Sequence, residues 1–486
     1  MDISTFGIFK NLSLIHGEWV ASTNSKKIDV LNPVDQSLIA TIPALEPAQI
    51  TAAIESSEQA LGAWKAHSVK QRSDILKKWY ALIIQHQDEL ATIMTVEQGK
   101  PLHEAKGEVN YAASFIEWFA EEGRRMNGDT IPAASKDKRI MTKREPVGVC
   151  VAITPWNFPA AMITRKVAPA LVAGCTVVVK PAQETPFTAL ALGYLAELAG
   201  VPKGVLNIVT GKSAEIVPVM TQSPIVKKLS FTGSTPVGAM LMEQSAPTLK
   251  KLSLELGGNA PLIVFNDADL DLAVQGVMDS KFRNAGQTCV CSNRIFVQAQ
   301  IYDVFIAKLA EKITALKLGN GLTAGTDIGP LINQKAINKI QAHIADALLH
   351  GGEIVVGGHQ SDLGGNFFEP TLIKNATDDM LCFRDETFAP LAPIFKFTDD
   401  AEVVTRANHT EFGLASYIFT ENLNRSIAVS EALEYGMVGI NTGLISTAEA
   451  PFGGVKASGL GREGSKYGLD EYTEIKYICV GNVAAM

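Results

Sequence analysis

Short apolar runs alternate with helical segments along residues 147–232, and this alternation constrains the fold more than any other feature of the sequence. Continuous apolar runs of this length are typical of strands that are buried on both faces. A strand–helix–strand series predicts a parallel sheet with helices on both faces, and right-handed crossovers make such a sheet doubly wound. The expected strands are residues 147–153, 176–180, 205–209 and 228–232, and the expected helices are 160–173, 187–199 and 213–222.

A second alternating series follows and predicts a second α/β domain at about 259–440. Its expected strands are residues 261–265 and 294–298, its expected helices are 269–284 and 301–317, and the Gly-rich stretch 351–373 is expected to be a loop. Before the first series, helical spacing predicts two or three helices between 47 and 97 and another over 106–125.

Composition excludes several classes of protein. The chain has 486 residues, 47% of them hydrophobic and 19% charged, which is the profile of a folded globular protein. A net charge of −8 opposes binding to nucleic acid, which usually needs a basic face. The most apolar stretch, 167–179, is shorter than the roughly 20 residues of a membrane span. With no signal peptide apparent, we expect a cytoplasmic protein without membrane contacts.

The cysteines and histidines show no metal-binding pattern. Six cysteines are scattered, no Cys-x-x-Cys occurs, and the eight histidines form no His-x-x-x-His pair. A structural zinc site and a secreted disulfide framework are therefore not expected.

Two groups of polar residues follow predicted strands of the first series. Lys180 ends one strand, and Gly233, Ser234 and Gly238 lie in the turn after another. Ligands of open α/β sheets bind outside the carboxyl ends of the strands, and a Gly-containing turn lets a phosphate reach backbone N–H groups. Taken singly, each feature is more often an ordinary surface lysine or an ordinary turn.

Cys289 and Glu255 are the candidate reactive side chains. Cys289 follows a Gly-containing turn, where a thiol can have a lowered pKa, and Glu255 ends a predicted strand before two glycines. A covalent cysteine mechanism needs a base, and Glu255 could be that base. Alone, neither decides the function, because most buried cysteines are inert and most strand-end carboxylates are structural.

Seven motifs occur in a fixed order and together are far more specific than any one of them. They resemble the aldehyde dehydrogenase superfamily over essentially the whole chain, and the resemblance implies two doubly wound α/β domains plus a small β oligomerisation element. The motifs are Trp156-Asn157-Phe158-Pro159, Lys180-Pro181-Ala182, Phe231-Thr232-Gly233-Ser234, Glu255-Leu256-Gly257-Gly258-Asn259, Gly286-Gln287-Thr288-Cys289, Glu386-Thr387-Phe388-Ala389-Pro390 and Pro451-Phe452-Gly453-Gly454.

The resemblance implies a catalytic role for three residues. Cys289 would attack the aldehyde carbonyl, and Asn157 would donate a hydrogen bond to the developing oxyanion. Glu255 would activate the water that hydrolyses the resulting thioester to a carboxylic acid. No metal is required.

The resemblance also implies a nicotinamide cofactor. Gln183 is neutral at a position where NAD-preferring relatives often carry Glu, so no carboxylate there repels a 2′-phosphate. We therefore expect NADP, with NAD also accepted, although the neighbouring Glu184 could take the place of that carboxylate. The implied cofactor-binding residues are Pro155, Trp156, Lys180, Ala182, Gln183, Gly233, Ser234, Gly238, Leu256, Glu386 and Phe388.

The segments around Arg165, Arg283 and Ser446, and the Gly-rich stretch 459–468, resemble the succinate-semialdehyde dehydrogenases. This implies that Arg165, Arg283 and Ser446 bind the distal carboxylate of succinate semialdehyde, in the setting of 4-aminobutyrate degradation. The alternative interpretation is that Arg165 and Arg283 pair with structural acids of the protein. Glutarate semialdehyde, a broader aldehyde range and, remotely, a non-catalytic binding protein remain alternatives.

Three further expectations rest on the resemblance. Cys291 could form a strained, reducible disulfide with Cys289, or it could simply pack as a small apolar residue. Residues 1–258 would bind the cofactor, 259–440 would carry the nucleophile, and 441–486 would be a return segment that ends in an oligomerisation strand. That strand, at about 472–480, and the segment 124–145 would join the subunits of a homotetramer.

Overall fold

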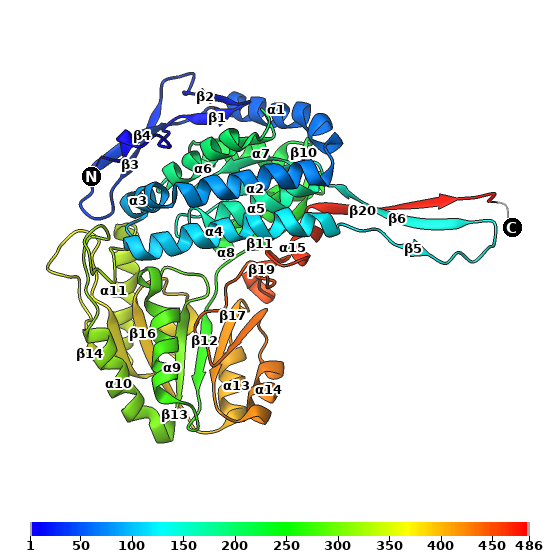
Figure 1. Ribbon diagram of the computed structural model, residues 1–486. Coiled ribbons are helices and arrows are strands. Elements are labelled where there is room, and N and C mark those ends of the chain that lie inside the picture. The colour runs from blue at the N-terminus through cyan, green and yellow to red at the C-terminus, as the bar shows by residue number, and fades with distance from the viewer. Residues whose placement is uncertain (1, 484–486) are drawn as a thin grey trace.

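The computed structural model describes residues 2–483, which form two large sheets, each flanked by helices (Figure 1). The first sheet has eight strands in the order β19-β11-β10-β7-β8-β9-β1-β2, and the five from β11 to β9 are parallel. Its strands are β1 (Ser13–Ile15), β2 (Glu18–Val20), β7 (Val149–Ile153), β8 (Thr176–Lys180), β9 (Leu206–Ile208), β10 (Val226–Thr232), β11 (Lys251–Glu255) and β19 (Gly459–Leu460).

Helices cover both faces of this sheet, and its central strands are therefore buried on both faces. The predicted strands and helices of the first series are all present, with bounds that shift by at most a few residues, and the doubly wound fold is confirmed. The helices are α1 (Pro47–Ala66), α2 (Val69–Gln85), α3 (Gln87–Gln98), α4 (Leu102–Glu122), α5 (Ala161–Ala173), α6 (Pro186–Ala199), α7 (Ser213–Gln222) and α8 (Thr235–Ser245).

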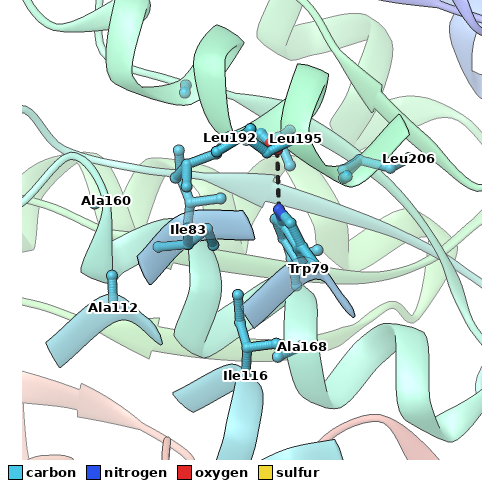
Figure 2. Packing of buried hydrophobic residues seen from close by; sticks show 14 of the residues in the cluster. Trp79, Ile83, Ala112, Ile116, Ala160, Ala168, Leu192, Leu195 and Leu206 are labelled. Atoms are coloured by element: carbon cyan, nitrogen blue, oxygen red, sulfur yellow. Dashed lines mark hydrogen bonds between the residues drawn. The ribbon is translucent and has the colours of Figure 1, made fainter. Parts of the chain in front are cut away.

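The core between these helices is built around buried tryptophans. Trp79 of α2 points toward α6, and its indole N–H donates to the Leu192 carbonyl at 3.1 Å (Figure 2). Ile83, Ile116 and Ala168 pack in the same cluster from α2, α4 and α5. The apolar face of α2 is therefore buried, and the indole N–H of Trp79 has a hydrogen-bond partner. This packing holds α2 against α4, α5 and α6.

The second sheet has seven strands in the order β14-β15-β16-β13-β12-β17-β18. Its strands are β12 (Ala260–Val264), β13 (Ser292–Gln298), β14 (Glu353–Val356), β15 (Thr371–Ala376), β16 (Leu391–Phe397), β17 (Ala415–Phe419) and β18 (Met437–Ile440), and its main helices are α9 (Leu270–Val277), α10 (Tyr302–Thr314), α11 (Gln334–Leu349), α13 (Asp400–Asn408) and α14 (Leu423–Ala432).

Two sequence expectations in this region were wrong. The stretch 351–373 is not all loop: β14 lies near its start and β15 begins at Thr371, paired antiparallel at the sheet edge. The helix expected over 269–284 ends at Val277 and continues as a π-helical turn over 278–282. Beyond it, Asn284 and Ala285 have positive φ angles of 51° and 55°, a backbone that no α-helix can adopt.

The predicted terminal strand is present as β20 (Thr473–Val480). It pairs antiparallel with β6 (Arg139–Pro146), which also pairs with β5 (Thr130–Ile131), and this three-stranded sheet extends away from the body as an arm (Figure 1). Ile475 and Tyr477 are 68% and 62% exposed. Large apolar side chains on an open strand favour a protein partner, but cover by another subunit stays a prediction.

Within residues 2–483, no helix is both long and apolar enough to span a membrane. The same residues contain no group of three or more His, Cys, Asp or Glu side chains that could hold a metal ion.

Candidate active site

The carboxyl ends of β7, β8, β10 and β11 meet at one edge of the first sheet. Ile153 pairs with Lys180, and Thr232 pairs with Glu255, so the residues that follow these strands lie side by side. This edge brings together Pro155, Trp156 and Asn157 after β7, Lys180 at the end of β8, Gly233 and Ser234 after β10, and Glu255 at the end of β11.

Two adjoining cavities open over this edge, with volumes of about 720 and 460 Å³. Nine of the eleven expected cofactor residues line one cavity or both. Lys180, Ala182 and Gln183 line the larger cavity, and Glu386 and Phe388 line the smaller one. Pro155, Trp156, Gly233 and Ser234 line both, so the cavities form one continuous groove, called the nucleotide groove below.

Gly238 and Leu256 do not line either cavity but pack against each other. A Cβ atom on Gly238 would lie 2.4 Å from a Leu256 methyl group, so a larger residue at this position would displace the Leu256 side chain. Their contact keeps the start of α8 close to the sheet edge.

Lys180 and Glu184 are charged residues that line the larger cavity. The Lys180 side chain is buried, its ammonium donates to the Pro181 carbonyl at 3.2 Å, and burial lowers the pKa of Lys180 to about 8. Gln183 donates to the Gly211 carbonyl at 2.8 Å, while Glu184 is exposed. A cation beside a neutral amide fits the ribose and phosphate groups of a dinucleotide.

Glu386 and Phe388 shape the smaller cavity. One Glu386 oxygen accepts from the Gly258 N–H at 3.0 Å, and burial raises the pKa of this carboxyl to about 7. Phe388 meets Trp156 edge to face, with 5.6 Å between ring centroids. The smaller cavity therefore fits the nicotinamide end of a dinucleotide, with a carboxylate that can accept hydrogen bonds from ribose hydroxyls and an aromatic wall beside the ring.

Asn157 is linked directly to the loop that carries Cys289. Its side-chain N–H donates to the Gln287 carbonyl at 3.0 Å, two residues before Cys289. On the other side of the loop, a Cβ on Gly258 would lie 2.5 Å from the Cys289 carbonyl oxygen, so the glycine allows this close approach. Burial raises the pKa of the Cys289 thiol to about 12, against the opposing effect of Arg165.

Glu255 is only 2% exposed, and one of its carboxylate oxygens has no hydrogen-bond partner among residues 2–483. Burial raises its pKa well above the ordinary value, and the nearby Glu463 carboxylate adds to this effect. A buried carboxyl with a raised pKa and a free oxygen has the properties of a general base.

Arg165, Lys166 and Glu463 form a buried charge cluster with Glu255. Arg165 and Lys166 both form ion pairs with Glu463, and Lys166 also donates to the Thr232 hydroxyl at 2.6 Å. Burial raises the pKa of Glu463, but the two cations outweigh this effect and leave the pKa lowered. Arg165 therefore pairs with an acid of the protein, and its Nη2 has no partner within the described residues.

Arg283 differs from Arg165 because it forms no ion pair within residues 2–483. It is half-buried, its Nε lacks a hydrogen-bond partner in that range, and its guanidinium lies 5.5 Å from the Phe158 ring centroid. Glu104 fixes the next residue by accepting from the Asn284 N–H at 3.0 Å. Ser446 is half-buried in the loop after β18 and forms no hydrogen bond within residues 2–483.

Cys291 is fully buried, and the ammonium of Lys281 donates to its sulfur at 3.3 Å. Cys289 and Cys291 are both free thiols in this structure. Burial raises the pKa of Cys291, with Lys281 opposing the shift. A disulfide between these two cysteines stays a prediction.

Sequence reasoning missed the partners of the candidate residues. Glu463 pairs with cations almost 300 residues earlier in the chain, and Lys100 donates to the Asn157 carbonyl at 2.8 Å. Lys100 belongs to no motif, and although Glu463 lies in the Gly-rich stretch 459–468, nothing in that stretch indicates which cations it pairs with. Only the fold brings them to the site.

Comparisons with known proteins agree with this geometry. The family model described as the aldehyde dehydrogenase family matches residues 19–478. The chain is 56% identical over 481 residues to the Escherichia coli succinate-semialdehyde dehydrogenase [NADP(+)] GabD, covering 99% of this chain and all of the relative. It is 55% identical over 483 residues to a Pseudomonas aeruginosa glutarate-semialdehyde dehydrogenase, again covering 99% and 100%.

Solved structures agree as well. The crystal structure of an Escherichia coli NADP-dependent enzyme superposes with a TM-score of 0.97 at 56% identity and covers 98% of each chain. A Staphylococcus aureus betaine aldehyde dehydrogenase in complex with NAD+ superposes with a TM-score of 0.96 at 34% identity, covering 100% of this chain and 98% of the other. The chain therefore belongs to the aldehyde dehydrogenase family.

Proposed function

We propose that the protein oxidises succinate semialdehyde to succinate, with NADP as the preferred oxidant and NAD as an accepted one. The observation that carries the substrate assignment is Arg283, a half-buried guanidinium without an ion-pair partner in the described chain. An aldehyde with a free carboxylate supplies the missing partner. The names of the relatives from Escherichia coli and Pseudomonas aeruginosa support this class of substrate.

Cys289 is the proposed nucleophile. Its thiol must lose a proton before it attacks, which burial makes costly and the positive charge of Arg165 eases. The sulfur then bonds to the aldehyde carbon, and the carbonyl oxygen becomes an oxyanion. The Asn157 side-chain N–H and the Cys289 backbone N–H donate to this oxyanion, and losing one such donor typically costs about 10²–10³ in rate.

NADP supplies the hydride acceptor when it is bound. Lys180, Gln183, Gly233 and Ser234 would hold its adenosine and phosphate end, and Glu386 and Phe388 its nicotinamide end. Loss of a hydride from the substrate carbon leaves a thioester on Cys289.

Glu255 is the proposed base for the second half of the reaction. It takes a proton from water, and the hydroxide bonds to the thioester carbon while the bond to the Cys289 sulfur breaks. Succinate leaves and the thiolate is restored. Glu255 must be ionised for this step, so its raised pKa places the active form toward higher pH.

Glutarate semialdehyde is the second candidate, favoured by the relative with that name. It is one methylene longer, and one methylene is worth only about 1–3 kcal/mol of discrimination. Arg283 would bind its carboxylate in the same way, with Arg165 and Ser446 completing the pocket.

Steady-state kinetics at 340 nm test this function. We expect a high kcat/KM for succinate semialdehyde, a lower one for glutarate semialdehyde, and a weak one for propanal, which has no carboxylate. The comparison of NADP with NAD tests the interpretation of Gln183. Equal turnover of propanal and the semialdehydes would keep the cysteine chemistry and overturn the substrate assignment.

We also propose a cytoplasmic homotetramer in which residues 1–258 bind the cofactor and 259–440 carry the nucleophile. The exposed Ile475 and Tyr477 on the arm formed by β5, β6 and β20 support the subunit contact. Light scattering after size exclusion tests it. The Ile475→Lys/Tyr477→Lys variant should have a smaller mass than the wild-type protein, and an unchanged mass would contradict this contact.

A further inference from the structure

The chain segment that carries Asn157 is held by a buried ion pair from another part of the fold. Lys100 follows α3 and Glu108 lies within α4, and their charged groups are 2.5 Å apart with each side chain only 1% exposed. Taking two charges out of water is costly, so a buried pair needs good geometry and further hydrogen bonds. Both partners direct their remaining contacts to residues 157–161.

Lys100 holds the start of this segment. Its ammonium donates to the Asn157 backbone carbonyl at 2.8 Å and lies 4.1 Å from the centroid of the Phe158 ring. Glu108 holds the end of the segment, because one of its oxygens accepts from the Ala160 N–H at 2.9 Å and the Ala161 N–H at 3.3 Å. These N–H groups lie at the start of α5 and have no partner within that helix.

A second contact joins the same carbonyl to the nucleophile loop. The Asn284 side chain donates to the Asn157 carbonyl at 3.0 Å and to the Gln287 carbonyl at 3.3 Å. Asn157 itself donates to the Gln287 carbonyl. The Asn157 backbone is therefore fixed from both sides, by the ion pair and by the loop that leads to Cys289.

We infer that Lys100 and Glu108 are positioning residues for the oxyanion donor: the buried ion pair holds the backbone at residues 157–161 so that the Asn157 side-chain N–H meets the oxygen that develops charge at Cys289. This inference rests on the proposed role of Asn157. An oxyanion donor acts only within hydrogen-bond reach of its target, and a misplacement of 1 Å can cost about 100-fold in rate.

A purely structural role would give the ion pair no special link to Asn157. Lys228 and Glu471 form a comparable pair, with 3.3 Å between charged groups and a fully buried lysine, but they join β10 to the segment before β20. Their other contacts are to Ser253 and, for Lys228, to the Tyr472 ring, and none of these is to residues 157–161. They therefore provide a matched control.

The experiment measures acylation of Cys289 without cofactor or semialdehyde. With p-nitrophenyl acetate, the thiolate bonds to the acetyl carbon, the bond to p-nitrophenolate breaks, and the released p-nitrophenolate is followed at 400 nm by stopped flow. Water then releases acetate and restores the thiolate. The variants are Lys100→Met/Glu108→Gln, which removes both charges together, Asn157→Ala, their combination, and Lys228→Met/Glu471→Gln.

The expected result is non-additive. Asn157→Ala should slow acylation about 10²–10³-fold, and Lys100→Met/Glu108→Gln about 10- to 100-fold with little change in KM. Their combination should be no more than about twofold slower than Asn157→Ala alone, since the ion pair acts through Asn157. Lys228→Met/Glu471→Gln should acylate within about threefold of the wild-type rate.

Three outcomes would overturn the inference. One is an unchanged acylation rate in Lys100→Met/Glu108→Gln. Another is the same fold loss with and without Asn157→Ala. The third is an equal loss in the Lys228 and Glu471 control. If Lys100→Met/Glu108→Gln does not fold, Glu108→Gln alone, which keeps an oxygen for the two N–H groups, is carried through the same cycle. A wild-type protein that is acylated but does not oxidise succinate semialdehyde would refute the proposed substrate. The comparison of acylation rates among the variants would still test the positioning role of Lys100 and Glu108.

Discussion

The nucleotide groove and the buried charge cluster lie at the same sheet edge, but they differ in whether their buried cations are paired with a carboxylate. In the groove, residues 2–483 offer the buried Lys180 only a carbonyl as hydrogen-bond partner, and the neighbouring Gln183 is neutral. In the cluster, Arg165 and Lys166 are both paired with Glu463. A ligand can complete the first region, whereas the second is largely balanced by the protein. Substitutions in the groove should therefore change binding, and substitutions in the cluster should also change stability.

The largest expected effect is on stability, in the charge cluster. Glu463→Gln leaves Arg165 and Lys166 buried without their carboxylate, and breaking a buried pair in this way costs about 3–5 kcal/mol. Urea denaturation should show this loss in the free energy of unfolding. The control is Glu434→Gln, which breaks an exposed pair with Lys456 and should cost less than about 1 kcal/mol. Equal losses would show that the cluster is not held by its charges.

The next effect is the pH dependence of catalysis. Both Cys289 and Glu255 act in deprotonated form, and burial raises both pKa values. The value of kcat/KM for succinate semialdehyde should therefore rise with pH from 6 to 9, by up to about tenfold per pH unit while a single group controls the rate. Glu255→Gln should remove the part of the rise that comes from the base. A profile that falls over this range would contradict the assigned roles.

In the nucleotide groove, Gln183→Glu should change cofactor choice, at the cost of the hydrogen bond to the Gly211 carbonyl, about 0.5–1.5 kcal/mol of stability. A carboxylate there repels a 2′-phosphate by about 1–2 kcal/mol, so kcat/KM for NADP should fall about five- to thirtyfold. The value for NAD should stay level or rise. The ratio of the two cofactors at 340 nm measures this. An unchanged ratio would show that residue 183 does not determine cofactor choice, and Glu184 would be the next residue to test.

The smallest effect is a pH dependence of NADP binding. Lys180 has a pKa of about 8, so its ammonium is charged below that pH and becomes neutral above it. The KM for NADP should rise a fewfold between pH 7 and 9.5, while the KM for NAD changes less. Lys180→Met should remove the difference between the cofactors. A KM for NADP that falls with pH would contradict a phosphate contact at Lys180.

The same contrast explains what could be predicted from the sequence. The groove residues follow strands with clear apolar runs, so their meeting at one sheet edge follows from the parallel order of β7, β8 and β10. The motif around Cys289 was equally visible. Glu463 and Lys100 were not, because their partners are brought together only by tertiary contacts. The π-helical turn before Arg283 was also missed, since the helical pattern continues through it.

The central claim is that Arg283 selects an aldehyde with a carboxylate. The most direct test is the ratio of kcat/KM for succinate semialdehyde to that for propanal, in the wild-type protein and in Arg283→Met. Losing one buried charged partner costs about 2–5 kcal/mol, so the semialdehyde should lose roughly 30- to 4,000-fold. Propanal should stay within about threefold. Equal losses on both substrates would contradict the claim and return Arg283 to a structural role.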